Sequence, residues 1–173
     1  MMNKLSWIVM ASLLVLSACG KNASSVSNEA IQTAEEETRW QTLTDDTGRV
    51  ALVVDKSFTV IPSAEDNGST TLTAENQNGV LLTVDHVGQL KTEPKQYFEQ
   101  LTNDVKNHGD NARVGIATEN RMNFNVSHTE DTTTFNNSCL ATIVEQEIYT
   151  VCATGTDIPF EQLDEHLKDV KVQ

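Results

Sequence analysis

Two of the three cysteines in the chain are spaced so that they can form a covalent cross-link. Cys139 and Cys152 lie in the stretch 138–153, which lacks glycine and proline and whose two arms are symmetric about Glu145 and Gln146. If those two residues form the turn of a hairpin, the cysteines face each other across the strands. Directly opposed residues have Cβ atoms about 4.5–5.5 Å apart, which is close to the separation in a disulfide. The sequence therefore predicts a disulfide between Cys139 and Cys152.

A redox pair and a metal pair are the competing interpretations of these two cysteines. A catalytic dithiol usually has Cys-x-x-Cys spacing at the start of a helix, where the pKa of one thiol falls. Cys139 and Cys152 have twelve residues between them and lie in predicted strands. A zinc site requires two more ligands of matching geometry. The residue pattern favours a structural cross-link.

Other side chains that could do chemistry form no recognisable constellation in the sequence. No Gly-x-Ser-x-Gly elbow and no glycine-rich phosphate loop occurs. The acid pairs Asp45-Asp46 and Asp164-Glu165 are typical of a solvated face rather than of general acid–base catalysis. The four histidines are dispersed and make no zinc-hydrolase motif: His86, His108, His128 and His166. We therefore expect a protein that is not an enzyme and that has no cofactor and no metal.

The third cysteine, Cys19, follows a segment with the pattern of a secretory signal. Residues 1–18 carry one cation, Lys4, then an apolar run over 7–16 and then small residues. The run is shorter than the about 20 residues that a membrane-spanning helix requires. Residues 1–18 are therefore predicted to be a signal peptide.

The residues around Cys19 resemble the lipobox of bacterial lipoprotein precursors, which reads here as Leu16-Ser17-Ala18-Cys19. The resemblance implies cleavage before Cys19, lipidation of its sulfur with a palmitate-type chain and acylation of its new amine. Gly20 follows Cys19, and by resemblance to enteric sorting rules this favours the outer membrane. The alternative is an ordinary signal peptide that leaves Cys19 as a free thiol.

Composition bounds the partners of the chain. Its 173 residues carry 25 acidic and 12 basic side chains and a net charge of −13. This balance argues against a nucleic-acid partner, since phosphates require a basic patch. It also argues against electrostatic docking on anionic lipid headgroups. Residues 19–39 are rich in Ser, Asn, Ala and Glu and are predicted to be a flexible acidic linker.

Residues 40–173 are predicted to form one globular domain, with Trp40 at its start. Apolar alternation predicts strands over 50–54 and 58–62, and the Asn78-Gly79 pair predicts a type I′ hairpin between 70–77 and 80–87. Helical spacing predicts one helix from Glu93-Pro94 to His108 and another from 157 to 170. Between the helices we expect strands over 113–119, 122–128 and 132–135, followed by the hairpin 139–153. The fold class is α+β, a mainly antiparallel sheet with amphipathic helices packed on it.

This order of elements resembles that of the DcrB-like bacterial lipoproteins, which share the PsbP-like α/β/α sandwich. The resemblance covers about residues 48–173 and rests on patterns rather than on a diagnostic motif. The segments that carry it are Ser57 to Pro62, the Asn78-Gly79 hairpin, the Glu93-Pro94 helix and the closing stretch from Tyr149 to Val172. It implies an envelope protein without catalytic residues. The Cys139 and Cys152 pair is not a feature of that family.

Two functional expectations follow from these predictions. The first is a lipid-anchored envelope lipoprotein that faces the periplasm and serves as a non-enzymatic accessory or binding module for an envelope protein. The second is a toxin-neutralising immunity lipoprotein, whose acidic face would block a basic effector toxin. A neighbouring gene for a secreted toxin would favour the second expectation, and an isolated locus would favour the first.

Overall fold

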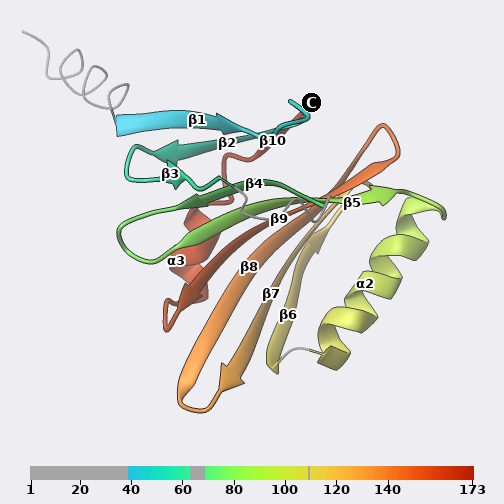
Figure 1. The fold of residues 1–173 in the computed structure, drawn as a ribbon. Helices are drawn as coiled ribbons and strands as arrows, with labels where there is room; N and C mark the ends of the chain where they lie inside the picture. The colour runs from blue at the N-terminus through green and yellow to red at the C-terminus, as the bar shows by residue number, and fades with distance from the viewer. Residues whose placement is uncertain (1–38, 63–68, 109) are drawn as a thin grey trace, which may run out of the picture.

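The computed structural model describes residues 39–62, 69–108 and 110–173, which form two antiparallel sheets and two helices (Figure 1). The predicted signal peptide 1–18, the lipidation site Cys19 and nearly all of the predicted linker lie outside the described residues. Among the helices of the described part, none is long and apolar enough to cross a membrane. The expected α+β class with a mainly antiparallel sheet is confirmed.

The smaller sheet has the strand order β1-β2-β10. Its strands are β1 (Trp40–Thr44), β2 (Val50–Asp55) and β10 (Lys171–Val172). Alternate residues of β2 point to opposite faces, and its Val50, Leu52 and Val54 are buried. The apolar run of the sequence therefore supplies the inner face of this sheet.

The larger sheet has seven antiparallel strands in the order β3-β4-β5-β9-β8-β7-β6. In chain order they are β3 (Thr59–Val60), β4 (Thr70–Glu75), β5 (Leu81–Gln89), β6 (Asp110–Ala117), β7 (Arg121–Glu130), β8 (Thr133–Val144) and β9 (Glu147–Thr156). The strand predicted over 58–62 is reduced to two residues at the edge of this sheet, beside β4. Pro62 cannot donate a ladder hydrogen bond, which is consistent with that edge position.

The β8–β9 hairpin has the register that the symmetric sequence predicts. Ile143 faces Ile148 and Cys139 faces Cys152. The two turn residues, Glu145 and Gln146, have φ values of 47° and 69°. Positive φ at both central residues is the mark of a type I′ turn, whose twist matches that of the strands.

The β4–β5 hairpin is present, but the predicted type I′ turn at Asn78-Gly79 is wrong. Within the turn only Gly79 has positive φ, at 76°. The Gly79 N–H donates to the Asn76 carbonyl at 3.1 Å, and the Asn76 N–H donates to the Val80 carbonyl at 3.1 Å. This is a three-residue loop with glycine in the left-handed position. The Asn76 side chain selects it, because its Oδ1 accepts the N–H groups of Asn78 and Val80 at 3.0 Å each.

Strand β8 is also longer than predicted, because the segment 132–135 and the first arm of the 139–153 hairpin are one continuous strand. The polar residues Asn136, Asn137 and Ser138 separate these two segments in the sequence. In the structure Asn136 faces Ser127 of β7, and its Oδ1 accepts the Ser127 hydroxyl at 2.7 Å. Polar partners on the neighbouring strands therefore allow the ladder to continue.

The first helix matches its prediction and the second does not. Helix α2 spans Pro94–His108, and its Phe98 and Val105 are buried. Helix α3 spans only Phe160–Glu165. Beyond it Leu167 and Val170 are still buried, but Leu167 lies in a turn and Val170 in the extended connection to β10. Helical spacing therefore found the buried residues but overestimated the length of the helix.

The large sheet is covered on both faces, and consecutive residues of β8 show this. Leu140 belongs to a core formed with the small sheet and α3, whereas Cys139 and Ala141 belong to a second core beneath α2. Because successive strand residues point to opposite faces, α2 and α3 lie on opposite sides of the sheet (Figure 1). The expected helical coverage of both faces is confirmed, and the small sheet on the α3 side is an addition that the sequence did not predict.

Candidate functional site

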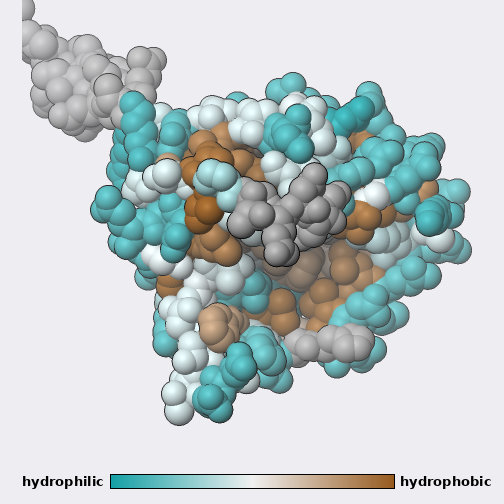
Figure 2. Space-filling model, in the orientation of Figure 1, coloured by the Kyte–Doolittle hydropathy of each residue, from teal (hydrophilic) through white to brown (hydrophobic). Residues whose placement is uncertain are grey.

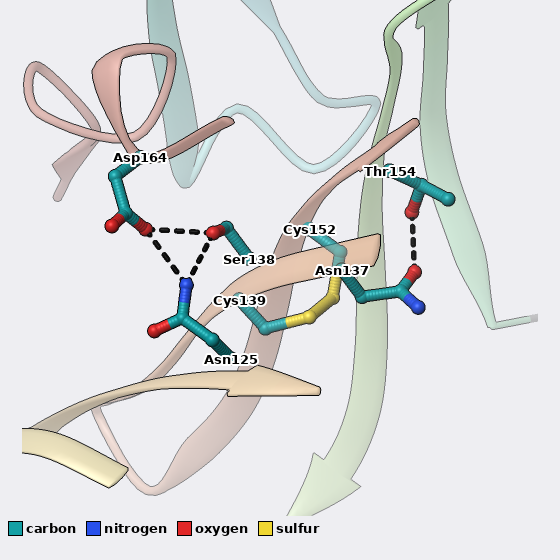
Figure 3. The surroundings of a disulfide bond; sticks show 7 residues. All are labelled: Asn125, Asn137, Ser138, Cys139, Cys152, Thr154 and Asp164. Carbon is teal, nitrogen blue, oxygen red and sulfur yellow. Dashed lines mark hydrogen bonds between the residues drawn. A yellow bond between two sulfur atoms is a disulfide. The ribbon is translucent and has the colours of Figure 1, made fainter. Parts of the chain in front are cut away.

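The two cysteines of the predicted disulfide lie next to each other in the middle of the large sheet. Cys139 and Cys152 form a disulfide, with an S–S distance of 2.12 Å and a Cα–Cα distance of 4.2 Å (Figure 3). The bond lies on the sheet face that α2 covers, where Cys139 is 4% exposed. Beside it Thr154 donates to the Asn137 side chain at 2.7 Å. The disulfide thus links β8 to β9 inside the second core.

On the opposite face a buried serine joins the sheet to α3. The hydroxyl of Ser138 donates to the Asp164 carboxylate at 2.7 Å and accepts from the Asn125 amide at 2.5 Å (Figure 3). The same amide nitrogen is 3.0 Å from Asp164 Oδ1. Ser138 is 0% exposed, so its hydroxyl is sealed from solvent and serves as a structural link. The arrangement assigns Asp164 of the predicted acid pair a structural role.

In the other acid pair, Asp45-Asp46, the first residue is buried and hydrogen-bonded and the second is exposed. Asp45 is 4% exposed and its Oδ1 accepts the Val50 N–H at 2.8 Å. Its second oxygen accepts the Thr47 hydroxyl. Asp45 therefore closes the loop between β1 and β2, while Asp46 is exposed. Its hydrogen bonds give Asp45 a structural role in this loop.

The structure places the described histidine side chains on separate elements. His86 of β5 lies 2.7 Å from the Glu147 carboxylate, and its ring is 5.1 Å from the ring of buried Tyr149. His128 is exposed on β7, and His166 follows α3. The side chain of His108 lies outside the described residues. Among the described residues there is no group of three or more His, Cys, Asp or Glu side chains that could hold a metal ion.

His166 has a protonation equilibrium that is altered by its surroundings. Burial lowers the pKa of its imidazole, and the negative charges of Asp55 and Glu165 oppose this effect without cancelling it. The ring packs edge-on against Phe58, with the ring centroids 5.1 Å apart. The folded protein therefore binds a proton at His166 more weakly than the unfolded chain does.

We expect the stability of the protein to fall as the pH drops below the ordinary histidine range. Because the folded pKa of His166 is lowered, its neutral form stabilises the fold above a pH of about 6.5, and this contribution is lost as the pH falls toward the lower folded pKa. The His166→Gln variant should lose that part of the pH dependence. Urea unfolding at about pH 7.5 and pH 5 measures it. An unchanged pH dependence in the variant, or an equal change in the exposed-site control His128→Gln, would refute the assignment.

A shallow groove lies between α2 and the turn that joins β6 to β7. It encloses about 670 Å³, within the usual range of ligand sites. Its lining combines the apolar ring of Phe98 with charged and amide side chains. The remaining lining residues are Lys95, Glu99, Thr102, Asn103, Thr118 and Glu119. The Thr102 hydroxyl donates a hydrogen bond to the sulfur of Met122 at 3.4 Å.

A second groove, of about 490 Å³, lies at the tip of the β8–β9 hairpin and the connection from β5 to α2. Glu145 and Gln146 of the turn line it together with Ile143. Neither groove was predicted from the sequence, because each joins segments that are distant in the chain. The only local signal was the turn that the symmetric arms of 138–153 predict at Glu145-Gln146. Both grooves are open to solvent along their length.

Comparisons with known proteins identify the fold. No protein-family model matches the sequence, and no curated protein sequence does. The Ran-binding protein Mog1p of Saccharomyces cerevisiae has a similar structure, with a TM-score of 0.52, 10% identity and coverage of 78% of this chain and 96% of that one. A point mutant of Mog1 gives a TM-score of 0.52 at 10% identity, covering 77% of this chain and 95% of its own.

The solution structure of cyanobacterial PsbP (CyanoP) from Synechocystis sp. PCC 6803 is a more distant neighbour. Its TM-score is 0.46 at 8% identity, with coverage of 91% of this chain and 99% of that chain. The likeness to Mog1p shows that the chain has the Mog1p/PsbP-like fold, as expected from the order of its elements. At these identities the likeness is one of fold.

Proposed function

We propose that the chain is an exported, lipid-anchored envelope protein whose folded domain serves as a non-enzymatic binding module beside the membrane. The observation that carries this proposal is the Cys139–Cys152 disulfide. Disulfides persist in oxidising compartments such as the bacterial periplasm and are rare in the cytosol. An export signal over 1–18 and a lipidated Cys19 would deliver the domain to such a compartment.

A binding role is supported by the structural hydrogen bonds of two residues that were candidates for catalysis. Ser138 is sealed by Asp164 and Asn125, and Asp45 closes a loop. The accessible features of the described residues include two shallow grooves, one beside α2 and one at the tip of the β8–β9 hairpin. The yeast protein Mog1p, which has a similar fold, is named as a Ran-binding protein, so this fold serves protein binding in at least one case. We propose membership of the DcrB-like lipoproteins, with Gly20 directing the protein to the outer membrane.

Membrane fractionation of cells that express the full chain tests the proposal. We expect the native protein in the membrane pellet as the cleaved and acylated form, because two or more acyl chains anchor a protein stably. We expect the Cys19→Ser variant to keep residues 1–18 and to carry no acyl mass, because the residue that defines the lipidation and cleavage site is gone. Cys139→Ser is the matched control, because it removes a cysteine of the folded domain and leaves the anchor. A Cys19→Ser protein that is cleaved at the same position and carries the same acyl mass as the native protein would contradict the proposal.

A further inference from the structure

The β1–β3 end of the domain, which we define by Arg39, Trp40, Lys56, Val60 and Ile61, carries exposed apolar and cationic side chains. Trp40 is 44% exposed, Val60 48% and Ile61 38%. Figure 2 shows apolar surface gathered where β3 lies in Figure 1. Large side chains that are exposed in this way mark contacts with partners or membranes more often than isolated ones do.

Strand pairing brings these residues to one end of the molecule. Trp40 pairs with Asp55, and the Lys56 N–H donates to the Arg39 carbonyl at 2.9 Å. The Gln41 side chain donates to the Phe58 carbonyl at 2.7 Å, which fastens β1 to the segment that enters β3. The cations and the apolar side chains therefore share one end of the domain.

The charges at this end differ from those of the chain as a whole. The Arg39 guanidinium lies 5.4 Å from the centroid of the Trp40 ring, and the Lys56 side chain is exposed. The acidic residues paired with this end are Asp55, whose Oδ1 accepts the Ser57 N–H at 2.8 Å, and Glu75, which faces Thr59. The two cations of this end balance these two acids, whereas elsewhere in the chain acidic residues outnumber basic ones. An anionic surface therefore repels this end least.

We propose that the β1–β3 end docks on the anionic phospholipid surface to which the protein is anchored. The proposal rests on the lipid anchor proposed above. Tryptophan prefers the membrane interface, and each nearby Lys or Arg adds a favourable interaction with anionic headgroups. This revises the expectation from net charge alone that the chain avoids anionic lipid, because the net charge averages over a polarised molecule.

The position of the anchor makes weak docking sufficient. Arg39 follows Cys19 by twenty positions. If those positions form the predicted flexible linker, its typical reach is about 25 Å. A short flexible tether of this kind gives an effective concentration on the order of millimolar, so a contact too weak to hold a free protein is largely formed in the tethered one. The docked domain then presents its opposite end, including the turns between β6 and β7 and between β8 and β9, to other partners.

The two tryptophans of the chain, Trp7 and Trp40, make the test direct. Removal of the predicted signal peptide leaves Trp40 as the single tryptophan of the mature protein. We expect the Trp40 emission of the acylated protein to shift to shorter wavelength in vesicles that contain phosphatidylglycerol, compared with pure phosphatidylcholine vesicles. Acyl chains that carry bromine should quench it in the anionic vesicles alone.

Matched charge variants show whether the two cations are responsible. The Arg39→Gln, Lys56→Gln pair should weaken the docking equilibrium by about thirtyfold, from the usual contribution of two cations near an anionic surface. The control pair Lys95→Gln, Lys106→Gln removes the same charge from the exposed face of α2 and should leave docking unchanged.

The intact mass first confirms that the protein is acylated. With the acylated protein, three results would overturn the proposal. They are an emission spectrum that is the same in both kinds of vesicle, equal effects of the two variant pairs, and a shift that grows with protein density at constant lipid composition. The last would assign Trp40 to a contact between copies through β1, the edge strand of the small sheet. If the mass shows no acylation, the proposed anchor fails instead. Docking is then tested separately, by titrating phosphatidylglycerol vesicles into the unacylated protein.

Discussion

Replacing Leu163 by alanine should lower the free energy of unfolding by about 2–5 kcal/mol. Leu163 is 0% exposed and lies in the core that α3 forms with the two sheets. Helix α3 has only six residues, so few backbone hydrogen bonds hold it, and the burial of this side chain fixes its position. A loss of this size is a large share of the about 5–15 kcal/mol by which a typical domain is stable.

Urea denaturation of the purified domain measures the effect, with Val87→Ala as the control. Val87 is 56% exposed on β5, so its truncation should change the free energy of unfolding by no more than about 0.5 kcal/mol. Similar losses in the two variants would mean that α3 does not pack as described.

Removing the disulfide should cost about 2–3 kcal/mol of stability. The double variant Cys139→Ala, Cys152→Ala frees a loop with a sequence separation of 13, for which the chain-entropy account gives about 3 kcal/mol. The observed loss should be somewhat smaller, because the turn at Glu145 and Gln146 and the strand pairing already keep the two arms close in the unfolded ensemble.

The reducing agent dithiothreitol provides the internal control for this prediction. It should lower the urea midpoint of the native protein toward that of the double variant and leave the double variant unchanged. A native protein whose midpoint is insensitive to complete reduction, verified by thiol titration, would show that the bond adds nothing to the fold.

The β8–β9 hairpin shows what the sequence determines by itself. Its two arms are related by position about Glu145 and Gln146, and one register pairs Cys139 with Cys152, Leu140 with Val151 and Ile143 with Ile148. A shift of one residue would turn all of its side chains to the other face of the sheet. Register, turn and disulfide were therefore predictable together from local sequence.

The polar residues of β8 show where such prediction fails. The strand propensity of Asn136, Asn137 and Ser138 is low. The sequence alone does not reveal the hydrogen-bond partners of their side chains. Those partners come from three other elements: Ser127 of β7, Thr154 of β9 and Asp164 of α3. A polar side chain can lie in the middle of a sheet when it has a hydrogen-bond partner, and here the tertiary structure brings that partner into place.

The small sheet was unpredictable for a related reason. Strand β10 pairs Lys171 with Ala51 and Val172 with Val50, across more than a hundred residues of sequence. Two residues have no periodicity to detect, and the helical spacing of Leu163, Leu167 and Val170 predicted a helix through this region. Long-range pairing ends the helix early and turns the chain back toward β2. The two grooves depend on the same long-range arrangement.

The intact mass of the protein extracted from membranes tests the central claim most directly. The lipid-anchor account predicts a chain that begins at Cys19, that carries the added mass of its acyl chains, and that gains two mass units on reduction of the Cys139–Cys152 bond. Globomycin should replace this species by the uncleaved precursor. A membrane or soluble protein with a free Cys19 thiol and no added lipid mass would contradict the account.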